Sequence, residues 1–287
     1  MQIPKLSVIT PSLNSGAFLE DAILSVALQD GVPVEHIVQD SLSQDNTLEI
    51  LRRYPEVRWQ WESDHGQSDA INRGFLKATG DLVGWLNADD YYLPGGLKAI
   101  AQAAAEHPEA DVFHGDCVFV DGAGSIERSK VEHEFDRDIL FYFGCYIPST
   151  ATLFRRRVIE QGHLLDCDYR VCMDFEYFVR LASAGFKFHY VPQFIAAFRW
   201  HDSNISLQQV ERRAFERREV QRRFGTRERS AMQMEILRQG FRAKRILRKI
   251  VSGNAKRELL IRQQRGRKTL WMRDEEAKKT CAHLASW

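Results

Sequence analysis

Hydrophobic and polar positions follow two alternating periods over the first 110 residues of the chain. Short β-branched or alternating runs predict strands, and apolar residues spaced three or four positions apart predict helices. We expect four strands and four helices in alternation, with the strands over 5–10, 34–40, 57–63 and 81–87 and the helices over 17–29, 47–54, 68–79 and 95–107. Strands that alternate with helices are typical of a parallel sheet in the α/β class.

The alternation is looser after residue 110. We expect further elements as follows: strands over 111–121 and 149–156, a turn at 121–124, a helix over 172–185, and two β-rich runs divided by Pro192 and Gln193. From about residue 206 the chain is polar, rich in arginine and helix-prone. We therefore predict a globular domain over residues 1–206 and a basic helical extension over residues 207–287.

The formal net charge of +1 hides a strong asymmetry between these two parts. Residues 1–210 carry 17 Lys or Arg against 30 Asp or Glu, a balance of −13. Residues 211–287 carry 23 Lys or Arg against 9 Asp or Glu, a balance of +14. An acidic body joined to a basic tail predicts two parts with different partners.

The basic extension contains an amphipathic pattern, in which apolar residues fall on one helical stripe among arginines: Ile236, Ala243, Leu247 and Ile250. Such a helix is typical of an element that lies on an anionic membrane surface. The alternatives are a stripe that packs on the globular domain or on a second copy of the chain, which would make a homo-oligomer. No nucleic-acid-binding module accompanies the basic residues, so we expect no nucleic-acid partner.

Composition narrows the class of protein further. Hydrophobic residues make up 44% of the chain, enough for a sizeable core. The five cysteines include no CxxC pair, which disfavours a disulfide framework and favours a reducing compartment. The start, MQIPKLSVIT, does not resemble a signal peptide, and no run of about 18 apolar residues is present. We expect a cytoplasmic protein, peripheral at the inner face of the membrane.

Two adjacent aspartates, Asp89 and Asp90, follow the strand expected over 81–87. In open α/β sheets, ligands bind outside the carboxyl ends of the strands. Neighbouring carboxylates there suit Mn²⁺ or Mg²⁺, with water and phosphate completing the coordination. The alternative is that one of them caps the helix that begins near Gly95.

The other expected strands also end in polar groups. Thr10, Pro11 and Asn14 follow the first strand, and Asp40 ends the second. Asp40 could accept hydrogen bonds from a base or a ribose, or it could form a turn. After the third strand come further polar residues and a glycine: Asp64, Gly66, Asp69 and Arg73. Four such endings at one sheet edge predict a polar wall that faces a single crevice.

The motifs in this order resemble the family 2 glycosyltransferases of the GT-A fold, especially those that build bacterial surface polysaccharides. The resemblance covers roughly residues 5–205 and rests on four segments, namely SVITPSLN, VQDSLSQDNTLEIL, DHGQSDAINRGFLKATGDLVGWLNADD and MDFEYFVRLASAG. It implies a Rossmann-like mixed sheet flanked by helices. It also implies a nucleotide-sugar donor, contacted by residues that match the family's motifs: Thr10, Pro11, Asn14, Asp40, Asp69, Arg73, Asn87 and Asp89.

The resemblance further implies a divalent metal, Mn²⁺ or Mg²⁺. The family's DxD-type element maps onto residues 87–90, with Asn87 where many relatives have Asp. This leaves Asp90 as the first metal ligand and Asp89 as a contact to metal or sugar. His201, within FRWHDSNISL, would be a third ligand or a diphosphate contact. The second strand departs from the family in having QDSLSQDNT without the usual glycines.

The family's catalytic base maps onto Asp174, in a segment expected to open a helix. Glu176 is the competing candidate, and both could instead be helix-start charges favoured by the helix dipole. We expect an inverting transferase that moves a sugar, from a UDP sugar, to a glycan or lipid-linked acceptor. Two alternatives stay open: an inactive GT-A module for binding or assembly, and a sugar nucleotidyltransferase, whose basic glycine-rich loop has no counterpart in SVITPSLNSGAF.

Overall fold

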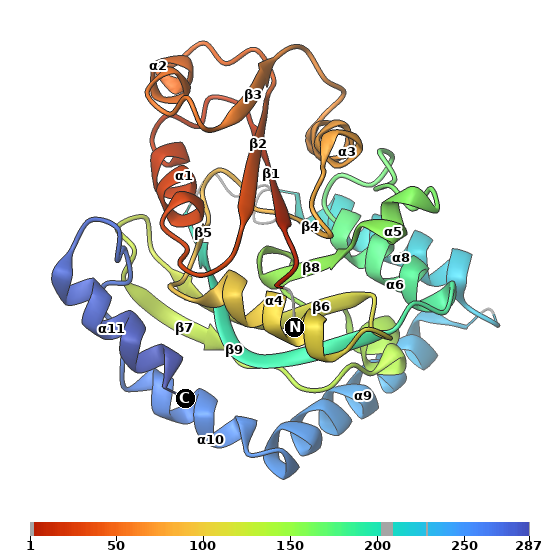
Figure 1. The fold of residues 1–287 in the computed structure, drawn as a ribbon. Coiled ribbons are helices and arrows are strands. Elements are labelled where there is room, and N and C mark those ends of the chain that lie inside the picture. The colour runs from red at the N-terminus through yellow and green to blue at the C-terminus, as the bar shows by residue number, and fades with distance from the viewer. Residues whose placement is uncertain (1–2, 202–208, 228, 287) are drawn as a thin grey trace.

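The computed structural model describes residues 3–201, 209–227 and 229–286 (Figure 1). The expected domain boundary at 206–207 lies outside these residues, as does the end of the FRWHDSNISL motif. The strands, in chain order, are β1 (Leu6–Ser12), β2 (Val34–Asp40), β3 (Arg58–Trp61), β4 (Leu82–Trp85), β5 (Tyr91–Tyr92), β6 (Val112–Val120), β7 (Ile126–Lys130), β8 (Thr152–Arg155) and β9 (Phe188–Arg199).

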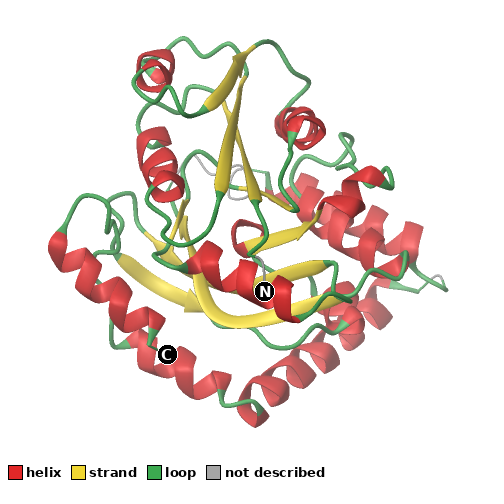
Figure 2. Cartoon of the chain, in the orientation of Figure 1, coloured by secondary structure: helices red, strands yellow, loops and turns green. Residues whose placement is uncertain are grey.

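The helices alternate with the strands in the first part of the chain and follow one another in the extension (Figure 2). They are α1 (Leu19–Ala27), α2 (Thr47–Arg52), α3 (Gln67–Lys77), α4 (Gly96–Glu106), α5 (Arg156–Glu160), α6 (Met173–Ser183), α8 (Val210–Phe224), α9 (Ala231–Val251), α10 (Asn254–Arg262) and α11 (Glu275–Ala285). A π-helical turn, η1 (Ile139–Phe143), and a 3₁₀ turn, η2 (Ser149–Ala151), lie between β7 and β8.

One mixed sheet runs through the molecule in the order β3-β2-β1-β4-β8-β6-β9-β5, with β7 paired to β6. The first four strands of this order are parallel, as the alternation of strands and helices predicts. Antiparallel pairing begins where β8 joins β4 and β6. The expected mixed α/β sheet flanked by helices is confirmed.

The centre of the sheet is covered on both faces, and every residue of β1 is buried. Helix α3 packs directly on β1 and β2. Gly74 makes this close approach possible, because a Cβ at this position would lie 2.4 Å from Ile9 Cγ2. Behind α3 an aromatic cluster surrounds the fully buried Trp85, whose ring lies 6.2 Å from that of Phe75 and 6.3 Å from that of Phe178. Trp85 is therefore a core residue.

Two expectations from the second half of the chain need correction. The β-rich runs on either side of Pro192 form one strand, β9, rather than two. The pairing of β9 with β6 jumps from Val191 to Phe194, so Pro192 and Gln193 sit in a bulge. Proline has no N–H for the ladder, and a bulge removes that requirement. The strand expected from residue 149 starts only at Thr152, after the 3₁₀ turn.

The basic extension packs against the acidic body through buried ion pairs. Figure 1 shows α9, α10 and α11 running around the outside of the sheet beside β7 and β9. Arg245 of α9 binds Glu132 at 2.7 Å, and Arg257 of α10 binds Asp116 at 3.1 Å, with both carboxylates fully buried. A buried carboxylate needs such a partner. The opposite charges of the two parts are therefore used, in part, within the molecule.

Candidate active site

Loops after β1 and β2 are joined to each other by hydrogen bonds. The Asp40 carboxylate, fully buried, accepts from the Ser43 N–H at 2.9 Å and the Ser43 hydroxyl at 2.6 Å. Ser43 Oγ in turn accepts from the N–H of Asn14 at 2.7 Å, and Asn14 has a positive φ of 48°. In this structure Asp40 is a turn former, and of the two residues Asn14 is the one exposed at the loop surface.

Thr10 and Pro11 are buried within β1. The Thr10 hydroxyl lies 2.8 Å from His36 Nε2 on the neighbouring strand. Burial lowers the pKa of His36 to about 3, so its imidazole is neutral. The side chains of Thr10 and Pro11 thus support the strand ends, while the loop beyond them carries the exposed groups.

Asp69 and Arg73 form an ion pair on the first turns of α3. Arg73 Nη2 donates to Asp69 at 2.8 Å, and Arg73 Nη1 donates to the Ser63 carbonyl at 2.8 Å. The other bond to Asp69 comes from the His65 N–H at 3.0 Å. These bonds hold the loop between β3 and α3 against the start of the helix.

The turn after β4 separates the two adjacent aspartates. Asp90 is buried, and its carboxylate accepts three hydrogen bonds: from the N–H of Arg199 at 2.9 Å, from the Thr150 hydroxyl at 3.0 Å and from Asn87 Nδ2 at 3.0 Å. Burial, and then the neighbouring Asp89 charge, raise the pKa of Asp90. Asp90 therefore ties the turn to β9 and η2. The same Asn87 accepts from Gln67 Nε2 at 2.8 Å.

Asp89 points the other way and meets His201. Asp89 Oδ2 lies 3.0 Å from His201 Nε2, and the two side chains are 26% and 19% exposed. The His201 ring stacks on Phe18, with ring centroids 5.1 Å apart. The structure thus brings together two of the three expected metal ligands, from positions 112 apart in the sequence, and turns the third, Asp90, towards the protein interior.

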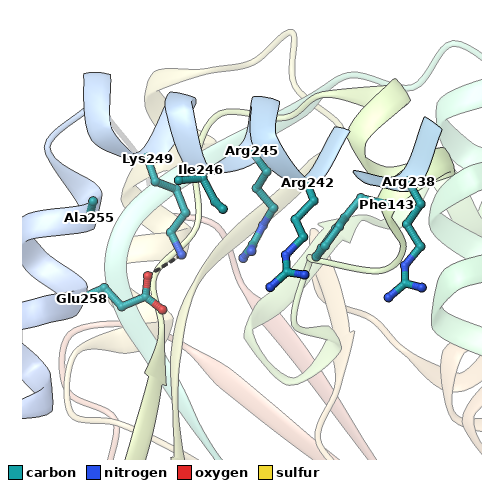
Figure 3. Close-up of a pocket in the computed structure, with 8 residues that line it drawn as sticks. All are labelled: Phe143, Arg238, Arg242, Arg245, Ile246, Lys249, Ala255 and Glu258. Atoms are coloured by element: carbon teal, nitrogen blue, oxygen red, sulfur yellow. Dashed lines mark ion pairs between the residues drawn. The ribbon is translucent and has the colours of Figure 1, made fainter. Parts of the chain in front are cut away.

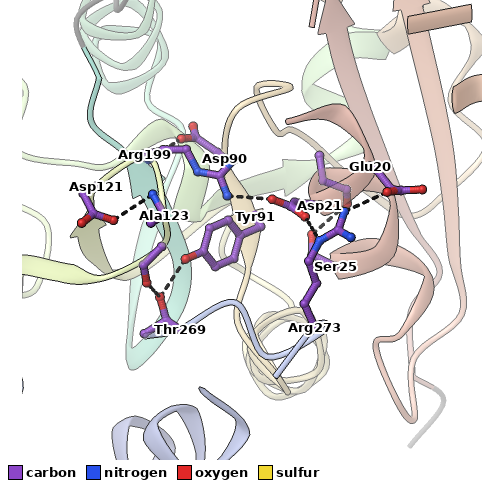
Figure 4. Close-up of polar contacts among 12 residues, drawn as sticks. Glu20, Asp21, Ser25, Asp90, Tyr91, Asp121, Ala123, Arg199, Thr269 and Arg273 are labelled. Atoms are coloured by element: carbon purple, nitrogen blue, oxygen red, sulfur yellow. Dashed lines mark hydrogen bonds and ion pairs between the residues drawn. The ribbon is translucent and has the colours of Figure 1, made fainter. Parts of the chain in front are cut away.

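A buried arginine anchors the end of β9 that carries His201. Arg199 is fully buried and donates to Asp21 at 2.9 Å (Figure 4). Its guanidinium lies 4.5 Å from the Phe18 ring centroid. Arg273, from the extension, also binds Asp21 and reaches Glu20 at 2.9 Å. Sequence reasoning did not single out Arg199 or Asp21. Arg199 stands two residues before His201 in FRWH, so the motif held a signal for it.

Asp174 and Glu176, the two candidates for the base, have different environments at the start of α6. Glu176 is fully buried and binds Arg180 at 2.8 and 3.0 Å, so it serves the core. Asp174 is only partly buried, and one oxygen accepts from the Phe175 N–H at 2.7 Å. Its other oxygen lies 3.6 Å from Cys145 Sγ. Burial raises the pKa of Asp174, which leaves this carboxyl as the candidate base.

The first turn of α3 connects these two halves of the site. Gln67 donates to Asn87, two residues before Asp89. The next residue, Ser68, places its hydroxyl 3.3 Å from the sulfur of Met173, the neighbour of Asp174. The turn after β4 and the start of α6 are therefore held by adjacent residues of one helix.

Comparison with known proteins supports this assignment of the fold. A profile of Glycosyl transferase family 2 matches residues 7–162. The chain is 28% identical over 214 residues to an uncharacterized glycosyltransferase of Nostoc sp., covering 70% of this chain and 66% of the relative. It is 30% identical over 189 residues to a PGL/p-HBAD biosynthesis glycosyltransferase of Mycobacterium tuberculosis, covering 64% and 72%.

A third relative is the GalNAc(5)-diNAcBac-PP-undecaprenol beta-1,3-glucosyltransferase of Campylobacter jejuni, 33% identical over 167 residues and covering 55% of this chain and 54% of the relative. The chain thus spans between about half and three quarters of these relatives.

Solved structures with the same fold have lower identity. Staphylococcus aureus TarS 1–349 in complex with UDP-GlcNAc gives a TM-score of 0.59 at 19% identity, covering 83% of this chain and 71% of that one. The mannosyltransferase PcManGT of Pyrobaculum calidifontis, in complex with GDP-Man and Mn²⁺, gives 0.60 at 17% identity, covering 83% and 69%. The sheet has the arrangement found in GT-A glycosyltransferases. Because the family profile matches more than half of the chain, the chain belongs to glycosyl transferase family 2.

Proposed function

We propose that this protein transfers a sugar from a nucleotide-diphosphate donor, a UDP sugar, to a glycan or lipid-linked acceptor in polysaccharide synthesis, with inversion at the anomeric carbon. The observation that carries the proposal is the contact between Asp89 and His201, which closes the end of β4 against the end of β9. The name of the Campylobacter jejuni relative, which specifies a PP-undecaprenol-linked glycan, supports the choice of acceptor.

Asp89 and His201 fit a site for Mn²⁺ or Mg²⁺ that is shared with the donor. Asp89 Oδ2 and His201 Nε2 lie 3.0 Å apart, a hydrogen-bond distance. After loss of the Nε2 proton the same two atoms could both bind one ion, because neighbouring ligands about 2.1 Å from an octahedral ion lie roughly 3.0 Å apart. In the described part of the chain no group of three or more His, Cys, Asp or Glu side chains is arranged around a metal position. Such ions commonly complete their coordination with water and substrate phosphates.

Within this site the two aspartates have different tasks. Asp89 and His201 would hold the cation, and a bound cation would stabilise the charge that develops on the leaving diphosphate. Asp90 positions Asp89, because its three hydrogen bonds fix the turn against β9 and η2. Arg199 positions His201 from the same strand end, through its bond to Asp21.

Donor contacts would come from the exposed and half-buried groups at the strand ends. Asn14 stands on the loop after β1, and the Asp69–Arg73 pair stands at the start of α3. Thr10, Pro11 and Asp40 would act through the backbone and loops that they support, because their side chains are buried. Direct contact between Asp40 and a base would require the Ser43 hydrogen bonds to open.

Asp174 is proposed as the base that removes the proton of the acceptor hydroxyl as its oxygen attacks the anomeric carbon. The raised pKa of its carboxyl strengthens it as a proton acceptor near neutral pH. The Phe175 N–H, bound to one oxygen, orients the carboxylate. Glu176 cannot take this part while it stays buried against Arg180.

Thermal stabilisation by nucleotide sugars tests the donor and the metal together. A donor at 100 times its Kd adds about 2.7 kcal/mol of stability, because it binds only the folded state. We expect a UDP sugar to raise the Tm when Mn²⁺ is present. Most of this rise should be lost when a chelator is added, and also in the variants Asp89→Asn and His201→Ala. Stabilisation by the donor without any sugar transfer would favour the inactive module, and unchanged transfer in chelator would refute the metal site.

A further inference from the structure

Helix α9 of the extension exposes a continuous apolar face to solvent. Five large aliphatic side chains along it are between 59% and 81% exposed, namely Met232, Ile236, Leu247, Ile250 and Val251. Ala243, between them in helical spacing, is also exposed. The stripe predicted from the sequence therefore does not pack on the globular domain.

The opposite side of α9 makes the contacts with the body. Lys244 and Arg248 bind Asp136 at 2.7 and 3.0 Å. The Phe241 ring stacks on Tyr142, with centroids 4.9 Å apart. These contacts anchor α9 to the body and leave its apolar face on the side away from them. A capping box formed by Ser230 and Gln233 also fixes where the helix begins.

Four basic side chains lie together along another side of α9. Arg238, Arg242, Arg245 and Lys249 extend from one side of α9 into a cavity of about 470 Å³, which Phe143 and Ile246 also line (Figure 3). Glu258 is the single acidic residue of this lining and pairs with Lys249. Arg242 makes no ion pair among the described residues. Arg238 pairs with Glu235 at 3.0 Å, and Arg245 pairs with the buried Glu132. The positive charge that this side of α9 offers to a partner is therefore that of Arg242, with the 43% exposed Arg238 beside it.

We propose that α9 docks the protein onto an anionic lipid bilayer, with its apolar face in the headgroup region and lipid phosphates at Arg242 and Arg238. Charge complementarity carries this choice, because a bilayer surface that contains anionic lipids offers negative charge directly beside apolar chains. The inference is independent of which sugar is transferred. Among the described residues, no helix has both the length and the apolarity needed to cross a bilayer, so the docking is to the surface.

A second copy of the chain fits this face less well. A twofold dimer through α9 would be self-complementary, so each apolar stripe would cover its copy. The exposed Arg238 and Arg242 of each copy would then lie near like charges of its partner, which disfavours the contact. An anionic surface satisfies the apolar stripe and the cations at the same time.

Vesicle sedimentation with the full chain tests the docking. We expect binding to vesicles of phosphatidylcholine with 30 mol% phosphatidylglycerol (roughly the anionic content that gives a strong surface potential) and little binding to pure phosphatidylcholine. Each basic residue near the surface is worth about fivefold in partitioning, which is about 1 kcal/mol. Arg238→Gln with Arg242→Gln should therefore weaken binding roughly 25-fold, and high salt should weaken binding by the wild type.

Matched control variants distinguish specific vesicle binding by α9 from non-specific vesicle binding by other surface residues. Leu247→Ser with Ile250→Ser should weaken binding at least tenfold, whereas Leu76→Ser on α3, a leucine 69% exposed, should leave it unchanged. Arg222→Gln on α8 is the control for charge.

The proposal is overturned if the wild-type protein does not bind anionic vesicles, or if the α9 variants bind them as tightly as the wild type. Sedimentation equilibrium that shows a dimer lost in Leu247→Ser would assign the face to a second copy.

Discussion

Glu216 of α8 links the extension to the candidate base, and its replacement is the most informative test of that link. Its carboxylate is buried and accepts hydrogen bonds from three consecutive backbone N–H groups, those of Arg170 at 3.0 Å, Val171 at 2.9 Å and Cys172 at 2.8 Å. Arg212 adds a fourth bond at 2.6 Å. Cys172 is the N-cap residue that directly precedes α6, two positions before Asp174.

The size of the effect of Glu216→Gln follows from this geometry. A carboxamide has one oxygen and one NH₂ group, so at least one backbone N–H faces a donor whichever way the amide is turned. A buried donor without a partner costs about 1–3 kcal/mol. The hydrogen bonds that remain are weaker, because they are made to a neutral amide instead of a charged carboxylate. We expect a loss of about 2–4 kcal/mol in unfolding free energy, and a fall in kcat as the start of α6 loosens.

Urea unfolding followed by tryptophan fluorescence measures the first quantity, and a transferase assay measures the second. Glu219→Gln is the matched control, because Glu219 lies on the same helix and, within the described residues, its ion pair is with the exposed Arg222. Its cost should stay within about 0.5 kcal/mol. Equal stability and equal kcat in the two variants would show that the extension does not support the site.

The same carboxylate gives a prediction for pH. Burial opposes ionisation of Glu216, but the bonds from Arg212 and from the backbone N–H groups outweigh it and lower the pKa. A lowered native pKa contributes stability above the unfolded value of about 4.3, and that stability is lost as the pH falls through the native pKa. The stability gap between wild type and Glu216→Gln should therefore narrow below about pH 4.3, and a gap that stays constant into acid would contradict the assigned bonds.

Three further substitutions test the base, the docking of the extension and the packing of the sheet. Asp174→Asn should leave donor binding, measured by calorimetry, near normal and lower kcat by about 10²–10⁴; an unchanged kcat excludes Asp174 as the base. Arg245→Ala leaves Glu132 buried without its partner and should cost about 3–5 kcal/mol in chemical denaturation. Gly74→Ala forces a methyl group against Ile9, and the shift of α3 that this requires should lower stability by about 1–3 kcal/mol in thermal unfolding; an unchanged Tm would contradict the close packing.

Local patterns were enough to predict most of the first half of the fold. The expected strands over 34–40 and 81–87 correspond to β2 and β4, and the helix over 95–107 corresponds to α4. Period and turn residues act over a few positions, so they are readable without knowledge of the rest of the chain. Between residues 110 and 170 the elements are short and irregular, and the turns η1 and η2 were not predicted.

The geometry of the site was harder to predict from the sequence, because the side chains of neighbouring residues can point in opposite directions. Asp89 and Asp90 were treated as a pair, yet one meets His201 and the other is buried against Thr150 and β9. The choice between Asp174 and Glu176 likewise depended on the ion pair between Arg180 and the buried Glu176. Motif matching identifies the residues of a site but not the direction of each side chain.

The uneven distribution of charge along the sequence predicted a basic extension. The spacing of apolar residues alone placed Ile236, Leu247 and Ile250 on one helical stripe. Only the tertiary structure showed that this stripe stays exposed while Arg245 and Arg257 enter the body. The physical reason is the range of the interactions. Helical periodicity is set within a few residues, whereas burial and ion pairing are set by partners more than 100 positions away in the sequence.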